Sequence, residues 1–373
     1  MKRFACIVLS MFLLLNPICI YADNDIPYSY VLMEGSTSTL LYSDNGNVTF
    51  RPFHSAKLMT LLLTVEAIHR GELSYDTVVT VSANANSQQG AQIWLSIGEE
   101  ISVHELILSI TVGNANDASI ALAEAISKSE DDFIRLMNSR AEELGMLNTR
   151  YVDVTGSSYN GSTTACDVAL LASELTKYPE LTEYFNTWIT YVRDGKTQLV
   201  NTNRLIKSYI PLTGMKAYYA DDCLNCLIAT AQKDGLTMAC VIMGEEDEYK
   251  RFSDAREKLN TGFSAYTLYK PKAEKFICEE VFVYKGTEGT VKTRLGKITH
   301  FIIRKSREED IEIIPEYYEN VTAPVYEGEQ VGRFKFMLDD EEIFSLPIVA
   351  SSCIEKRNFF TTFLKLLTKI ITM

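Results

Sequence analysis

Stretches of strand-like and helix-like hydrophobic pattern follow one another along the chain. Between about residues 28 and 43, apolar and polar side chains alternate with a period of two, which is typical of β-strands. Asp44-Asn45-Gly46-Asn47 then predicts the turn of a hairpin. Apolar positions at helical spacing follow, over 55–70, 103–127, 130–145 and 165–177. Strand patterns return near 186–245, including 223–232 and 236–243.

Helical pattern stops near Tyr269-Lys270-Pro271-Lys272. From Val281 to Val349 the sequence shows short strands, such as the apolar positions Phe334, Phe336 and Leu338. An antiparallel sheet flanked by a mostly helical insertion, followed by a small all-β unit, predicts an α+β fold. We expect one domain over 23–270 and a sandwich-like β domain over 271–352.

The N-terminus resembles a secretory signal. Lys2 and Arg3 precede an apolar run, and a small residue stands before Asp23. We therefore expect residues 1–22 to be removed, with an uncleaved N-terminal anchor as the alternative. Either form would place the chain outside the cytoplasm of a bacterium, at the outer face of the membrane or in the periplasm or cell-wall space.

The C-terminal stretch 353–373 has a two-sided helical pattern. Its apolar side is formed by positions 359, 360, 363, 364, 366, 367, 370 and 371. Lys356, Arg357, Lys365 and Lys369 outweigh Glu355, which gives this segment a net charge of +3. Such a helix is too short to span a bilayer and fits an anionic membrane surface. The alternative is a helix packed on the last domain.

Composition narrows the classes of function. The chain has 36 Lys and Arg against 49 Asp and Glu, a net charge of −13, which argues against a nucleic-acid partner. Six cysteines remain after residue 22, scattered along a chain that needs no disulfide to build a core. Cys223 and Cys226 have redox or metal spacing, but no second pair or nearby histidine completes a zinc site. We therefore predict no metal and no cofactor.

Two motifs carry a family resemblance. Residues 52–60 read Pro-Phe-His-Ser-Ala-Lys-Leu-Met-Thr before an apolar helix, and residues 114–124 read Asn-Ala-Asn-Asp-Ala-Ser-Ile-Ala-Leu-Ala-Glu. Shorter matches follow at 137–138, 144–149, 201–205 and 251–254. In order and spacing, over roughly residues 28 to 350, the chain resembles the serine D-Ala-D-Ala carboxypeptidases, the low-molecular-mass penicillin-binding proteins. The resemblance implies a penicillin-binding-protein or β-lactamase-like domain before the β domain.

The resemblance also implies a chemistry built on three motifs. A serine and a lysine three positions later share a helix face, so that the amine takes the hydroxyl proton. A Ser-x-Asn element places a second hydroxyl and an amide in the cleft. A Lys-Thr-Gly strand then binds the terminal carboxylate of the substrate.

The first two motifs are altered here. Lys57 is present, but the nucleophile position is His54. Ser55 does not replace the serine, because two helical residues span about 200° and turn Ser55 away from Lys57. In the second motif Asn116 is retained, and Asn114 stands at the serine position.

The third motif is altered as well. Lys216 is retained, Ala217 lacks the hydroxyl, and Tyr218 puts a ring where the family has glycine. The retained residues Lys57, Asn116 and Lys216 also fit a purely structural role, in which they hydrogen-bond and hold the cleft together. Removing the nucleophile of a serine hydrolase costs about 10⁶-fold in turnover.

Three hypotheses follow from these residues. The first is a catalytically degenerate homologue of the peptidoglycan carboxypeptidases that binds a stem peptide or a protein partner at the membrane. The second is an active D-Ala-D-Ala carboxypeptidase or other hydrolase with an unconventional nucleophile. The third is a structural scaffold that acts through its C-terminal β domain.

Overall fold

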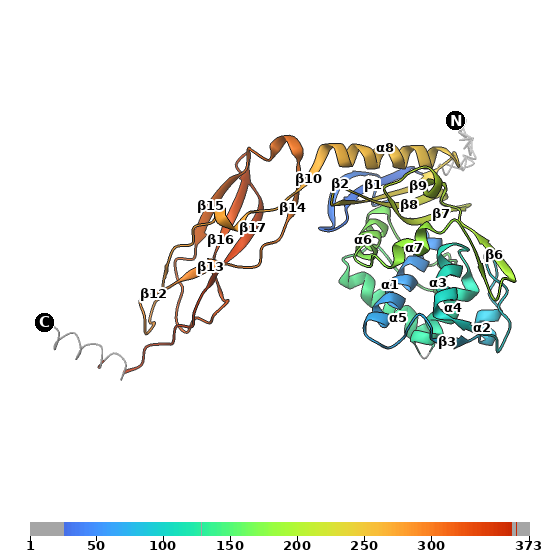
Figure 1. The fold of residues 1–373 in the computed structure, drawn as a ribbon, viewed down its shortest axis with the longest axis horizontal. Coiled ribbons are helices and arrows are strands. Elements are labelled where there is room, and N and C mark those ends of the chain that lie inside the picture. Colours follow the sequence, from blue (N-terminus) through green and yellow to red (C-terminus); the bar gives the residue numbers. More distant parts are fainter. Residues whose placement is uncertain (1–25, 128, 360–362, 364–373) are drawn as a thin grey trace, which may run out of the picture.

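The computed structural model describes residues 26–127, 129–359 and 363. These residues form two bodies that follow one another along the long axis of the molecule (Figure 1). The N-terminal body combines a sheet with helices, and the C-terminal body is built almost entirely of strands. The predicted α+β fold with a C-terminal β domain is therefore confirmed.

A five-stranded antiparallel sheet is the framework of the N-terminal body, with the strand order β2-β1-β9-β8-β7. Its strands are β1 (Ser29–Glu34), β2 (Thr39–Asp44), β7 (Leu212–Ala220), β8 (Leu224–Lys233) and β9 (Leu236–Glu245). Strand β7 forms one edge and carries Lys216 and Tyr218, so the residues of the third motif lie at the border of the sheet.

Both faces of this sheet are covered. Helix α8 (Lys250–Ala265) packs on one face of the sheet. Leu227 and Ile242 belong to the apolar core between this helix and the sheet. Ile228, which follows Leu227, and Val241, which precedes Ile242, belong to the other core. This second core lies between the sheet and the helical subdomain (Figure 1). Since successive strand residues point to opposite faces, β8 and β9 are apolar almost throughout.

The helical subdomain surrounds helix α1 (Ala56–His69), whose side chains are buried on nearly every side because its sequence is apolar all round. The other helices are α2 (Ala83–Asn86), α3 (Val103–Thr111), α4 (Asn116–Ile126), α5 (Glu130–Glu143), α6 (Ala165–Leu175) and α7 (Leu181–Asn186). Two small two-stranded sheets complete it, β3 (Val78–Thr80) with β4 (Glu100–Ser102), and the hairpin of β5 (Ile189–Val192) with β6 (Thr197–Val200). Short 3₁₀ helices are η1 (Phe53–Ser55), η2 (Arg204–Lys207), η3 (Ala273–Lys275) and η4 (Lys305–Arg307).

The C-terminal body has its own apolar core, in which the rings of Phe301, Phe336 and Phe344 stack or meet edge to face. Strand β10 (Tyr266–Tyr269), which follows α8, pairs with β14 (Phe301–Arg304). The four-stranded sheet has the order β13 (Thr293–Leu295), β17 (Glu341–Ala350), β16 (Gln330–Leu338) and β15 (Glu312–Tyr317). A further pair is β11 (Val281–Phe282) with β12 (Thr290–Val291).

Three sequence expectations were wrong in detail. The first hairpin turns at 35–38, where backbone and hydroxyl groups of Ser36 and Thr37 bind the buried Glu34 carboxylate, and the turn at 44–47 follows β2 instead. The helix expected over 103–127 is two helices separated by 112–115. Strands β16 and β17 are long rather than short, with nine and ten residues.

Two expectations concern the ends of the chain. The predicted signal at 1–22 lies outside the described residues, and so does the predicted tail helix beyond Phe359, except for Phe363. Within the described part of the chain, none of the helices has the length and apolarity needed to cross a membrane.

Candidate functional site

A tight turn before α1 presents His54. The amide of Phe53, which has a left-handed φ of 41°, donates to the carbonyl of Gly156 at 2.9 Å. A side chain at Gly156 would bring its Cβ within 2.2 Å of the Phe53 oxygen, so glycine is required there. The position of His54 is thus set by a contact between segments about 100 residues apart in the chain.

His54 and Lys57 are in contact one helical turn apart. The Nζ of Lys57 lies 3.4 Å from Nδ1 of His54. Among the described residues, His54 is the sole hydrogen-bond partner of the Lys57 amine. Lys57 is 1% exposed, and burial lowers the pKa of its amine to about 7 although the Asp153 carboxylate acts in the opposite direction. The neighbouring Ser55 is buried, and its hydroxyl donates to the Pro52 carbonyl and not to Lys57.

Lys216 of β7 is bound on the inside of the cleft. Its Nζ donates to the carbonyl of Ile110 at 2.5 Å and to Oδ1 of Asn114 at 2.7 Å. Asn114 holds this position in the left-handed region, with φ 56°, which asparagine tolerates better than most residues. Burial, and then the nearby Lys57 cation, lowers the pKa of the Lys216 amine.

Two side chains of the altered motifs connect to His54. The ring of Tyr218 stacks on the imidazole, with centroids 5.3 Å apart and planes inclined by 29°. Burial, and then the cations of Lys57 and Lys216, lower the pKa of His54, while the nearby Asn114 side chain acts in the opposite direction. The imidazole is therefore neutral at pH 7.

Asn116 begins helix α4 and binds the loop that precedes α3. Its Nδ2 donates to the Gln89 carbonyl at 2.6 Å, and its backbone amide donates to the Ala91 carbonyl at the same distance. Its buried Oδ1 has no hydrogen-bond partner in the described structure. Asn116 thus holds the loop at 89–91, with one acceptor unused, and its side chain forms no hydrogen bond within the described structure to the cluster of His54, Lys57, Asn114, Lys216 and Tyr218.

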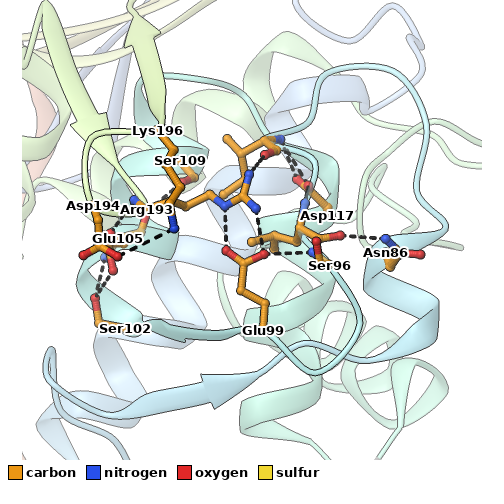
Figure 2. Close-up of polar contacts among 12 residues, drawn as sticks. Asn86, Ser96, Glu99, Ser102, Glu105, Ser109, Asp117, Arg193, Asp194 and Lys196 are labelled. Atoms are coloured by element: carbon orange, nitrogen blue, oxygen red, sulfur yellow. Dashed lines mark hydrogen bonds and ion pairs between the residues drawn. The ribbon is translucent and has the colours of Figure 1, made fainter.

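A network missed by the sequence analysis holds this loop (Figure 2). The Asp117 carboxylate accepts from the amides of Ile93 and Leu95, each at 3.1 Å. Arg193, at the tip of the β5–β6 hairpin, binds both oxygens of Glu99 at 2.6 and 2.8 Å and the Ile93 carbonyl at 2.8 Å. The sequence analysis predicted only strand pattern around Arg193, and a charged residue between strands gives no signal for this role.

Ala217 does not join the cluster, because its side chain packs in the core beneath α8. It also lines a groove of about 980 Å³ that borders Tyr218 on the outer side of β7. The polar and aromatic members of this groove are Trp188, Asn201, Thr202, Arg204, Lys207, Tyr219, Asn225, Glu246, Glu248 and Arg251. The groove therefore offers cations, acids and aromatic rings to a ligand.

The comparisons with known proteins agree with this architecture. The structure superposes on penicillin binding protein 5 from Haemophilus influenzae with a TM-score of 0.79, at 24% identity, covering 88% of this chain and 97% of the other. It superposes on the carboxypeptidase DacD from Francisella tularensis with a TM-score of 0.69, at 25% identity, covering 88% and 94%. The fold is therefore that of the penicillin-binding proteins.

Sequence comparison defines the family. The D-alanyl-D-alanine carboxypeptidase profile matches residues 23–247, and the profile of the C-terminal domain of penicillin-binding protein 5 matches 263–356. The carboxypeptidase DacF of Bacillus subtilis (strain 168) is 34% identical over 342 residues, covering 90% of this chain and 88% of the relative. DacC of Escherichia coli (strain K12) is 27% identical, covering 89% and 85%. This chain belongs to the D-alanyl-D-alanine carboxypeptidase family, as the resemblance predicted.

Proposed function

We propose that this chain is a catalytically degenerate member of its family, which binds a peptidoglycan stem peptide without hydrolysing it. The observation that supports this most directly is the environment of His54. The imidazole contacts Lys57, stacks on Tyr218 and lies near Asn114, and these three neighbours come from the three altered motifs. Because the substituted residues pack against one another, we interpret the site as stabilised in a new arrangement and not as a damaged active site.

The cations of the cleft support the same proposal. A lysine that recognises a terminal carboxylate needs an N–H directed at the ligand. Here the Lys216 amine is 2% exposed and already donates to Ile110 and Asn114. The Tyr218 ring, 4% exposed, lies over the position where a peptide would approach the strand. Binding of a carboxylate by Lys216 would therefore require both neighbours to move.

The groove outside β7 is the better place for a peptide. Lys207 stacks over Trp188 at 4.0 Å and forms no ion pair with a described carboxylate, so its amine is available to an anionic ligand. Arg204 also lines the groove, although Glu248 neutralises it in part at 3.1 Å. A volume of about 980 Å³ fits a short peptide.

The location is part of the proposal. An exported chain with a basic amphipathic tail would be held at the outer face of the cytoplasmic membrane, where stem peptides occur. The distribution of charge supports this location, because the segment 355–373 has a net charge of +3 whereas the whole chain has a net charge of −13.

Titration calorimetry with a pentapeptide ending in D-Ala-D-Ala tests the proposal. We expect heat of binding, no release of D-alanine, and weaker binding by Lys207→Ala. The control is Lys275→Ala, on the exposed helix η3 away from the groove. Release of D-alanine would contradict the proposal, and so would absence of binding by a folded protein.

The second candidate function, hydrolysis with an unconventional nucleophile, is favoured by one observation. Lys57 has a pKa lowered to about 7 and faces an imidazole nitrogen, so at neutral pH part of the population holds a free amine base beside a nucleophilic ring. An acyl group transferred to His54 would be labile, however, because acyl-imidazoles hydrolyse readily. D-Alanine release that is lost in both Lys57→Ala and His54→Ala would favour this candidate.

A further inference from the structure

Two buried cysteines lie against each other behind Tyr218. Cys223 and Cys226 are both 0% exposed and are separated by two residues in the chain. The Cys226 Sγ also lies 3.2 Å from the Cys223 carbonyl oxygen. The other four described cysteines lie elsewhere. Cys240 is in the core beneath α8, Cys166 contacts Ser43, and Cys278 and Cys353 belong to the C-terminal body.

The backbone around the pair is tightly held. The Cys223 amide donates to Ala220 at 3.1 Å, and its carbonyl accepts from Gly244 at 3.0 Å. Leu224, with a φ of 49°, then turns the chain into β8. The Cys226 sulfur is thus held against the backbone of Cys223, the residue with which it would form a disulfide.

A metal does not account for these thiols. Within the part of the chain that the structure describes, no third His, Cys, Asp or Glu joins them in a group that could hold an ion. Zinc held by protein needs three or four such ligands. Formation of a disulfide, in contrast, requires only the two cysteines.

We propose that Cys223 and Cys226 form an intramolecular disulfide when the chain folds in the presence of a low-molecular-mass disulfide such as oxidised glutathione. One thiolate attacks the glutathione disulfide, which forms a mixed disulfide and expels one glutathione thiolate. The second cysteine thiolate attacks the mixed disulfide and expels the other glutathione. Both cysteines lose a proton to water, and the two electrons reduce one glutathione disulfide to two thiols.

The timing follows from the burial of the site. Both side chains are 0% exposed in the folded chain, so glutathione reaches them only before β7 and β8 close. The same burial shields the completed bond from external reductants. The Cys226 side chain and burial raise the pKa of the Cys223 thiol. Because Cys226 is the cross-strand partner of Tyr218, the disulfide fixes the strand beneath the ring that fills the cleft.

Refolding followed by peptide mass spectrometry tests this inference. The full chain, denatured and reduced, is refolded in a buffer of oxidised and reduced glutathione, denatured again, alkylated without reduction and digested with trypsin. Cleavage after Lys216 and Lys233 releases one peptide that contains both cysteines and no others. The peptide over 234–250, with Cys240 alone, is the internal control.

We expect the 217–233 peptide to be unalkylated and lighter by two hydrogen atoms than its reduced form, while Cys240 is alkylated. In Cys226→Ser, Cys223 should become alkylated, whereas Cys240→Ser should leave the pair oxidised. Alkylation of both cysteines in the native sequence would overturn the inference. A disulfide that links the 217–233 peptide to another part of the chain would overturn it too.

Discussion

At the scale of single residues, the proposed function depends on how His54 is held. Tyr218 stacks on it, Asn114 lies near it, and Ala217 offers no hydroxyl to a substrate carboxylate. A serine at position 54 would therefore gain Lys57 as a base and still face a blocked cleft. We predict that His54→Ser alone forms no acyl-enzyme with penicillin, as measured by intact mass. Robust labelling of this single variant would show that Tyr218 does not block the cleft.

Lys57 provides a second prediction at this scale. Its pKa is about 7 in the folded chain against the usual 10.5, so between these pH values unfolding takes up a proton and rising pH stabilises the fold. The free energy of unfolding should rise by about 1 kcal/mol per pH unit from this group between pH 8 and 9.5. Urea denaturation of Lys57→Met should lack this increment, whereas the exposed control Lys275→Met should keep it. If the free energy of unfolding rose equally with pH in Lys57→Met and in the native chain, Lys57 would not be the group with the lowered pKa.

At the scale of elements, the β5–β6 hairpin is attached to the loop that supports Asn116. Arg193 makes three charge-assisted contacts there, two to Glu99 and one to Ile93 (Figure 2). We predict that Arg193→Ala lowers the free energy of unfolding by about 2 kcal/mol, and Arg193→Lys by less, because lysine keeps the charge without the two-pronged geometry. Urea denaturation measures both.

The matched control for this hairpin is Lys196→Ala. Lys196 is three residues away, its side chain is 72% exposed, and its nearest acid, Asp194, is 3.9 Å distant. Its loss should change stability by less than about 0.5 kcal/mol. If Arg193→Ala proved as mild as this control, the hairpin would not depend on the Glu99 contact.

At the scale of the whole molecule, charge is distributed unevenly along the chain. The segment 355–373 carries +3 on a protein of −13, and each cation near an anionic membrane contributes about 1 kcal/mol. We predict that the full chain cosediments with vesicles containing anionic lipid, less so at high salt, and that a chain ending at residue 352 does not. Reversing Lys365 and Lys369 to glutamate is the control that keeps the apolar face. Binding that neither change reduces would place the membrane contact elsewhere.

The sequence predicted contacts that depend on local spacing, and it missed those that depend on long-range packing. Helical geometry already places His54 beside Lys57 and excludes Ser55, and in the structure Lys57 contacts His54 while Ser55 bonds to Pro52. The bond from Lys216 to Asn114 joins residues 102 positions apart, and no periodicity encodes it. The same holds for Arg193, because a charged residue in a turn looks solvated until its partner Glu99 is in place.

The most direct test of catalytic degeneracy is fluorescent-penicillin labelling of the full chain, with penicillin binding protein 5 from Haemophilus influenzae as the positive control and Lys57→Ala as the matched variant. We predict no covalent band for this protein at any time point, because its Lys57 faces the imidazole of His54, which stacks on Tyr218 and lies near Asn114, and not a serine hydroxyl. A covalent band on the native chain that disappears in Lys57→Ala would contradict the account and show that a working nucleophile remains.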